Sequence, residues 1–258
     1  RVKYQVQGSP LVSIILSEDH ANADSAKCEQ SIRSKTTYSN YEILVRRAGT
    51  TWNEAAAKAK GEYLLFLDSD CICMQESWLE ELLGVAQRGE VGAVGGVVSY
   101  PKGVIRDAGI TLGVGYYNLG SCNFYLLNDD HSGFWGNFYY MHNVSAVSDT
   151  CMLVRKEYYD QAGGMDDGLK AWFAGFDLSL KLMKSGKVNV LDPYARMGFA
   201  HHDMINWEAR RNANGEYVDE TEQMNLLKER WSEVIRKGDP YYNANLTKNS
   251  SDFILGKF

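Results

Sequence analysis

The sequence predicts an α/β protein with a mixed, mainly parallel central sheet and helices on both faces. Three short runs rich in β-branched and apolar residues, at 11–16, 41–45 and 62–67, have the length of buried strands. A helical pattern follows each of them, at about 24–34, 52–60 and 75–88. Alternation of strands and helices in this way is typical of a parallel sheet.

The second part of the chain continues with less regular elements. We expect strands at 91–98, 110–114, 149–155, 188–191 and 196–199, and helices at 156–162, 176–185 and 219–236. Between them, residues 113–147 are rich in glycine and aromatic side chains, which is too aromatic for a disordered segment. This segment is either a packed loop bordering an acceptor cleft or a cover for the core, and the sequence leaves both alternatives open.

Composition narrows the class of protein. The 258 residues are enough for one large α/β domain or two small ones. A net charge of −6 without a run of basic residues argues against a nucleic-acid partner. The longest apolar runs are strand-sized, so we expect no membrane span and no signal peptide. The five cysteines lack zinc-site spacing and predict reduced thiols in a cytoplasmic protein. Because the chain does not begin with Met, we expect an excised or processed domain.

The most informative stretch is the strand that ends in Asp68-Ser69-Asp70. Ligands of open α/β sheets bind outside the carboxyl ends of the strands, so both carboxylates are expected at the rim of a crevice. Hard oxygen ligands suit Mg²⁺ or Mn²⁺ bound together with nucleotide phosphates. The alternative is that these residues cap the following helix, because Asp and Ser are favoured at that position.

A series of motifs in this order resembles the inverting, nucleotide-sugar-dependent glycosyltransferases of family 2, and most nearly the bacterial enzymes that build rhamnan and O-antigen-type polysaccharides. The motifs run collinearly over nearly the whole chain: Pro10-Leu11-Val12-Ser13-Ile14-Ile15, 31–43, 59–70, Trp78-Leu79-Glu80-Glu81-Leu82, 91–95, Asp107-Ala108-Gly109, Asn143-Val144-Ser145-Ala146-Val147, Gly163-Gly164-Met165-Asp166, His201-His202 and Asp239-Pro240-Tyr241-Tyr242-Asn243. The resemblance says little about the sugar.

The resemblance implies the GT-A fold of nucleotide-diphospho-sugar transferases in a single domain. It divides the chain into a nucleotide-binding half at about 8–100, an acceptor-binding half at about 101–216, and a C-terminal helix and tail at about 217–258. By this likeness Asp68, Ser69 and Asp70 face the nucleotide, and Asp68 and Asp70 ligate Mn²⁺ or Mg²⁺. His201 or His202 supplies a further metal ligand in this interpretation, with a buried, backbone-bonded histidine as the alternative.

The catalytic base is where the sequence departs from the family. An inverting transfer needs a base for the acceptor hydroxyl, and the family has an acidic residue at the position of Gly175. Asp177 matches the last acid of that motif and is either a displaced base or an N-terminal helix cap or partner of the helix dipole. Asp149 stands where the family usually has a small residue and is a second candidate carboxylate.

The nucleotide-binding loops also differ from the family pattern. The first strand leads into Ser17-Glu18-Asp19-His20, and the second into Arg46-Arg47 with a shortened stretch before Asn53. Asn53 remains a candidate contact of the nucleotide. The two arginines either contact phosphate or face solvent.

Two functions follow from these motifs. The first is a metal-dependent inverting glycosyltransferase of cell-surface polysaccharide biosynthesis, which transfers a sugar from a UDP- or dTDP-linked donor to a glycan or lipid-linked glycan. We expect it in the cytoplasm, with peripheral attachment to the inner membrane as an option. The second is a catalytically silent GT-A domain that binds a glycan or a partner within a larger synthase.

Overall fold

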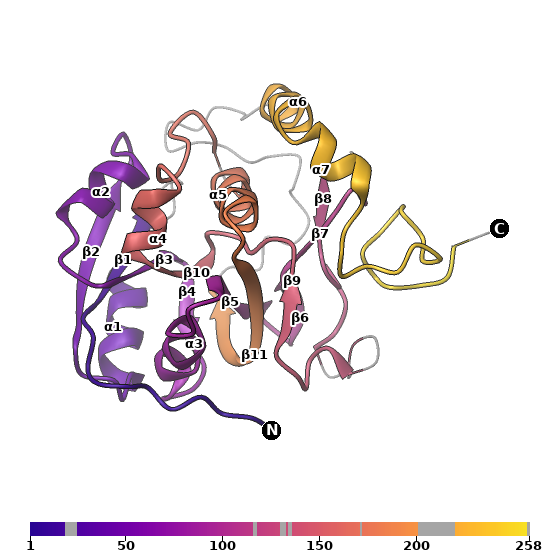
Figure 1. Ribbon diagram of the computed structural model, residues 1–258. Helices are drawn as coiled ribbons and strands as arrows, with labels where there is room; N and C mark the ends of the chain where they lie inside the picture. The colour runs from indigo at the N-terminus through magenta and orange to yellow at the C-terminus, as the bar shows by residue number, and fades with distance from the viewer. Residues whose placement is uncertain are drawn as a thin grey trace.

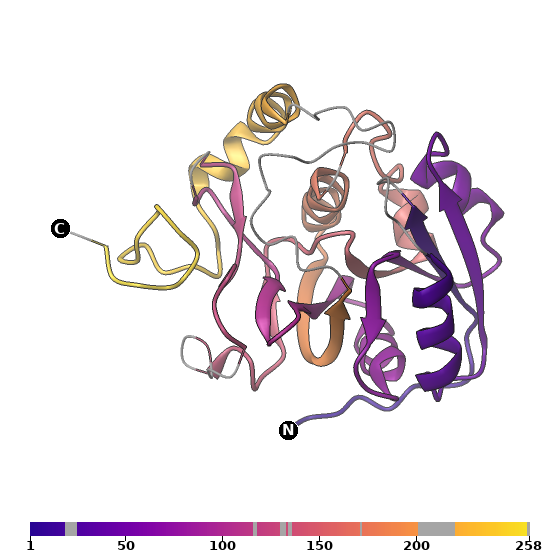
Figure 2. The same cartoon turned by 180° about the vertical axis from the view of Figure 1, so that it is seen from behind.

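A nine-stranded mixed sheet organises the protein, in the order β2-β1-β3-β10-β5-β11-β4, with β6 paired to β5 and β9 to β11 (Figure 1). The computed structural model describes residues 1–18, 25–115, 118–129, 133, 136–170, 172–200 and 220–256. A separate pair of strands, β7 (Ile110–Leu112) and β8 (Gly120–Cys122), lies beside the C-terminal helices in both views (Figures 1 and 2).

The first three strands are parallel, as their alternation with helices predicts. β1 (Val12–Glu18) lies between β2 (Tyr41–Arg47) and β3 (Tyr63–Asp68), and its Ser17 is level with Asp68 at the end of β3. The remaining strands complete the mixed sheet: β4 (Cys71–Cys73), β5 (Val91–Tyr100), β6 (Val104–Asp107), β9 (His142–Val144), β10 (Cys151–Arg155) and β11 (Val188–Phe199). β10 is antiparallel to both β3 and β5, which it joins.

The central strands are apolar on both faces because helices cover both. Along β3, Leu64 and Phe66 belong to one buried cluster, whereas Leu65 and Leu67 belong to the other. Figure 1 shows α1 (Ser25–Lys35) and α3 (Trp78–Ala86) below the sheet. Above it lie α2 (Trp52–Lys58), α4 (Lys156–Gln161) and α5 (Phe173–Lys184). The fold therefore confirms the α/β prediction with helices on both faces.

Three predicted elements need correction. The strands expected at 188–191 and 196–199 are one strand, β11, which stays continuous through an irregular register between Asp192 and Arg196. The helix expected at 219–236 is two helices, α6 (Thr221–Arg230) and α7 (Ser232–Lys237), which meet at Trp231. Asp68-Ser69-Asp70 does not cap a helix, because β4 follows it and α3 begins only after its N-cap Ser77.

The sheet crosses the predicted boundary between the two halves. β10 comes from the part assigned to the acceptor, yet it lies between two strands of the part assigned to the nucleotide. The two halves are thus joined within one sheet, and their functional division stays a prediction. Within the described ranges, none of the helices has the length and apolarity needed to cross a membrane.

Candidate active site

The acid pair lies at the carboxyl end of β3, where the sequence predicts it. The backbone N–H of Asp68 donates to the carbonyl of Thr150 at 3.0 Å, which ties this strand end to the start of β10. The N–H of Asp70 donates to Oδ1 of Asp68 at 2.9 Å and closes a tight Asx turn. The side chain of Asp68 is 19% exposed, whereas Asp70 is buried. The turn therefore fixes both carboxylates on rigid backbone.

Two carboxylates at one turn fit a Mg²⁺ or Mn²⁺ ion that is completed by water and substrate phosphates. Among the described residues there is no group of three or more His, Cys, Asp or Glu side chains that could hold a metal by themselves. Asp68 and Asp70 would then be the protein ligands of a metal ion whose other ligands are water and substrate phosphates. The predicted ligands His201 and His202 lie outside the described residues.

A third carboxylate, Asp149, lies in the same site. Its side chain is buried, and burial raises its pKa to about 7, an effect that the positive charge of Arg46 opposes and the negative charge of Asp68 strengthens. A hydrogen bond from Trp52 lowers the same pKa. At neutral pH Asp149 is therefore partly protonated and partly a carboxylate, which is the range useful for a general base.

Arg46 contributes a buried positive charge beside Asp149. Its guanidinium lies 4.1 Å over the ring of Trp52 and its Nη1 donates to the carbonyl of Thr50 at 2.9 Å. Burial lowers the pKa of Arg46, while the carboxylates of Asp149 and Asp68 raise it. Both arginines belong to the end of β2, which is two residues longer than predicted; Arg46 is buried at the site, and Arg47 is exposed.

Arg106 contributes a second positive charge, next to Asp68. Its Nη1 donates to Oγ1 of Thr150 at 2.6 Å, and its Nη2 lies 3.8 Å from Oδ2 of Asp68. The guanidinium lies 4.2 Å over the ring of Phe199. Burial lowers the pKa of Arg106, but Asp68 and other neighbours outweigh burial and raise it above its usual value. The side chain is a permanent cation, and no sequence motif pointed to it.

Gly175, at the usual position of the base, packs directly against the backbone of Asp149. A Cβ built on Gly175 would lie 2.5 Å from the Asp149 nitrogen and 3.2 Å from its Cα. No side chain fits there without a shift of the backbone around Asp149. The space beside this turn of α5 is therefore occupied by a segment that carries a carboxylate of its own.

Asp177 has a different environment from Asp149. Its side chain is fully buried in α5, where Oδ1 accepts from Trp231 Nε1 at 2.8 Å and from Arg230 Nη1 at 3.0 Å, and Oδ2 pairs with Lys181 at 2.9 Å. The interpretation of Asp177 as a helix cap is wrong, since the N-cap of α5 is Trp172. Its role as a base stays a prediction, and its contacts with Arg230 and Trp231 hold the C-terminal end of α6 against α5.

Asn53 is also held by protein groups. Its Nδ2 donates to the carbonyl of Met165 at 2.7 Å, and its Oδ1 accepts from the hydroxyl of Tyr159 at 2.7 Å. The amide thus links α2 to the turn after α4. The nucleotide contact expected of Asn53 stays a prediction, and this placement gives it no support.

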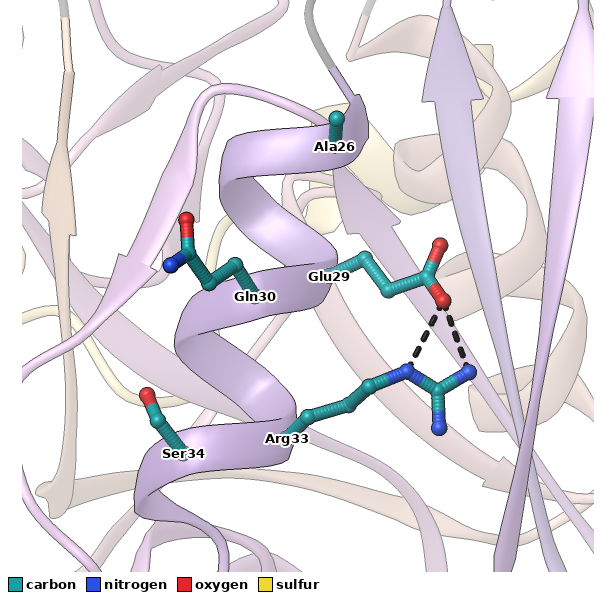
Figure 3. Close-up of a pocket in the computed structure, with 5 residues that line it drawn as sticks. All are labelled: Ala26, Glu29, Gln30, Arg33 and Ser34. Carbon is teal, nitrogen blue, oxygen red and sulfur yellow. Dashed lines mark hydrogen bonds and ion pairs between the residues drawn. The ribbon is translucent and has the colours of Figure 1, made fainter.

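A hollow of about 450 Å³ lies elsewhere, along α1 (Figure 3). The side chains that line it come from one helix, and Glu29 and Arg33 pair with each other there at 2.7 Å. None of the site residues described above lines this hollow, so we assign no function to it.

Comparison with known proteins agrees with this geometry. Residues 45–163 match the model of the family described as Glycosyl transferase family 2. The uncharacterized protein y4gI of Sinorhizobium fredii (strain NBRC 101917 / NGR234) is 29% identical over 289 residues, with 99% of this chain and 31% of the relative covered. The O-antigen biosynthesis protein RfbC of Myxococcus xanthus is 29% identical over 282 residues, with 98% of this chain and 21% of the relative covered. The chain thus spans less than a third of either relative.

Solved structures show the same fold. GalNAc-T7, solved with UDP, GalNAc and Mn²⁺, has a TM-score of 0.61 at 14% identity and covers 88% of this chain and 50% of its own. The mannosyltransferase PcManGT from Pyrobaculum calidifontis, solved with GDP-Man and Mn²⁺, has a TM-score of 0.55 at 12% identity, with 92% and 68% covered. Together with the sheet topology, the two solved structures show that the chain has the GT-A fold, and its residues 45–163 are similar to the family described as Glycosyl transferase family 2.

Proposed function

We propose that this domain is a metal-dependent inverting glycosyltransferase that transfers a sugar from a nucleoside-diphosphate sugar to a glycan or lipid-linked glycan in polysaccharide biosynthesis. The observation that carries the proposal is the gathering of Asp68, Asp70 and the buried Asp149 where β3 ends and β10 begins. The relative named for O-antigen biosynthesis and the neighbours solved with nucleotides and Mn²⁺ support it.

In this proposal Asp68 and Asp70 bind the donor through the metal. A bound Mn²⁺ or Mg²⁺ neutralises the charge that develops on the leaving nucleoside diphosphate. The chain contributes the two carboxylates and the tight turn that orients them. Ser69 is buried within the turn between the two carboxylates.

Asp149 is the base in this proposal. Its carboxylate takes the proton of the acceptor hydroxyl, whose oxygen attacks the anomeric carbon from the face opposite the leaving group. The new C–O bond forms as the bond to the diphosphate breaks, and the configuration at this carbon inverts. Arg46 is a positioning residue, because its charge keeps part of the buried Asp149 ionised at neutral pH.

Asp149→Asn tests this assignment. We expect at least a hundredfold loss in kcat, with little change in donor affinity, because general-base catalysis contributes about 10²–10⁴-fold. For the wild-type enzyme, kcat/KM should rise with pH through about 7. Arg46→Gln removes the charge that lowers this pKa, so the rising limb should move to higher pH. Unchanged turnover in Asp149→Asn would remove Asp149 from the mechanism.

A catalytically silent domain is the second candidate, and the glycine at the usual base position favours it. Calorimetric titration with Mn²⁺ and a panel of UDP-, dTDP- and GDP-linked sugars separates the two. Binding followed by donor turnover supports the enzyme, whereas no heat with any nucleotide supports the silent domain.

We also propose that the reaction takes place in the cytoplasm, at the membrane surface if the acceptor is lipid-linked. The support is indirect: all five cysteines are described, and all are free thiols. Co-fractionation of the full-length protein with membranes, measured at low and high salt, tests peripheral attachment.

A further inference from the structure

We propose that Arg106 is a donor-binding residue that changes partner: it neutralises Asp68 before substrate binds and contacts the diphosphate of the nucleotide sugar afterwards. The inference rests on the proposed function, because it requires a nucleoside diphosphate beside Asp68. It assigns to Arg106 a role in substrate binding and in stabilising the leaving group.

The geometry fixes the guanidinium at the edge of the acid pair. Arg106 belongs to β6. Its two neighbours in the chain, Ile105 and Asp107, both pair with residues of β5. One face of the guanidinium lies on the ring of Phe199, and Nη1 is bonded to the hydroxyl of Thr150. That hydroxyl is held in turn by Oγ of Ser148 at 2.8 Å. The cation is therefore positioned before any substrate arrives.

The contact with Asp68 is an ion pair without a hydrogen bond. The distance of 3.8 Å between Nη2 and Oδ2 exceeds hydrogen-bond length, although it is short enough for attraction between the charges. The Arg106 side chain is 21% exposed, so part of it is accessible from solvent beside Asp68. In this proposal a phosphate oxygen replaces Asp68 as the partner of Nη2, while Phe199 and Thr150 keep the guanidinium in place.

Charge predicts two opposite effects of Arg106. A divalent cation on Asp68 would be repelled by a guanidinium this close, so Arg106 weakens the binding of the metal alone. A diphosphate between the two cations reverses the sign, because its negative charges attract both. The protein should therefore take up the metal with the nucleotide and only weakly without it.

The same contact serves the chemical step. When the bond between the anomeric carbon and the diphosphate breaks, its electron pair stays on the diphosphate oxygen, and no proton is required there. A guanidinium held at the phosphates stabilises that charge, and its planar fork of donors matches two phosphate oxygens. A lysine at this position would supply the positive charge but not the planar pair of N–H donors.

The test is calorimetric titration of wild-type protein, Arg106→Gln and Arg106→Lys with Mn²⁺ alone, and with UDP, dTDP or GDP in the presence of Mn²⁺. Arg106→Gln should bind Mn²⁺ alone about tenfold more tightly and the nucleotide at least tenfold more weakly. Arg106→Lys should keep the weak binding of Mn²⁺ alone and lose part of the nucleotide affinity. Arg196→Gln is the matched control, since Arg196 is a half-buried arginine paired with Asp129 at 3.2 Å, and it should change neither affinity.

The two opposite changes distinguish this role from a structural one, because a misfolded variant would lose both affinities. The inference about Arg106 would be overturned if Arg106→Gln bound the nucleotide as tightly as wild type, or if it lost both affinities. The proposed function would stand in either case. Absence of nucleotide binding by the wild-type protein would overturn the proposed function, and this inference with it.

Discussion

At the scale of single residues, two of the carboxylates in the candidate site each have a guanidinium group beside them. Arg46 lies beside Asp149, and Arg106 lies beside Asp68. Each cation is placed by an aromatic ring, Trp52 in one case and Phe199 in the other. Buried charges are costly unless they are paired, so this pairing lets several ionisable groups share one site.

The ionisation of Asp149 should appear in the stability of the protein. Burial raises its pKa in the folded state to about 7, above the ordinary value of 3.8, so folding favours the protonated form. Stability contributed by this group is therefore lost as pH rises from about 4 to about 7. Asp149→Asn, which carries no charge, should be more stable than wild type at pH 8, by on the order of 1–4 kcal/mol. The difference should vanish near pH 4.

Thermal unfolding at several pH values checks this prediction, with Asp166→Asn as the control of opposite sign. The hydrogen bond from Arg230 lowers the pKa of Asp166 despite partial burial. Asp166→Asn should therefore lose stability at pH 8 and approach wild type at low pH. A pH-independent effect of Asp149→Asn would contradict the assignment of a raised pKa.

Gly175→Ala tests the packing that we connect with the displaced carboxylate. The added methyl group would lie 2.5 Å from the Asp149 nitrogen, so the backbone must move. We expect a destabilisation of about 1–3 kcal/mol and a loss of turnover larger than the loss of donor affinity. Gly89→Ala is the control, since a Cβ there meets nothing within 4 Å. Turnover equal to wild type would show that Asp149 is not sensitive to this contact.

At the scale of elements, the helices and strands that the sequence predicts well are those with strong local sequence patterns. The first three strands are continuous apolar runs, and α2 begins with a capping box in which Thr51 and Glu54 bond to each other's backbone. Such signals lie within a few residues of one another. The acid pair is predictable for the same reason, because it directly follows a strongly apolar strand.

Contacts between distant segments explain what the sequence could not predict. The direction of β10 depends on its pairing with β3 and β5, which lie more than fifty residues earlier. The burial of Arg46 depends on Trp52 and on Asp149, about a hundred residues later. Arg106 lies in β6, a strand that the sequence did not predict, and it reaches the site only because β6 folds back on β5. Only the tertiary fold shows which polar residues meet.

Asp177 should act as an anchor between α5 and α6. Asp177→Ala would leave Arg230, Lys181 and the indole of Trp231 without their buried partner. We expect a loss of about 3–5 kcal/mol in the free energy of unfolding, as for other broken buried ion pairs. Asp166→Ala removes a partly exposed partner of the same arginine and should cost about 1 kcal/mol or less. Chemical denaturation followed by tryptophan fluorescence measures both, and equal losses would contradict the anchor.

At the scale of the whole molecule, the sheet holds the two predicted halves together. β3 and β5 do not pair with each other, and β10 bonds to both. The loop that carries Asp149 runs into β10, and the Asp68 N–H bonds to Thr150 in that loop. The segments that we propose to bind the metal and to carry the base therefore belong to the same sheet.

Hydrogen exchange should reflect this arrangement. Amide protons of Met152, Leu153 and Val154 lie between two neighbouring strands and should exchange at the slowest, global rate. Those of β2, at the edge of the sheet, should exchange faster. Mass spectrometry of peptides from both strands measures the difference, and comparable rates would show that β10 opens independently of the core.

The place of β10 also has a consequence for biosynthesis. Until residues 151–155 have been synthesised, β2-β1-β3 and β5-β6 are two pieces whose inner edges lack the strand that separates them in the folded sheet. Exposed edges of this kind invite pairing with other chains, and long-range strand closure is slow. The site formed by Asp68, Asp70 and Asp149 can therefore assemble only after Arg155 has been synthesised, and until then the nascent chain carries unpaired strand edges.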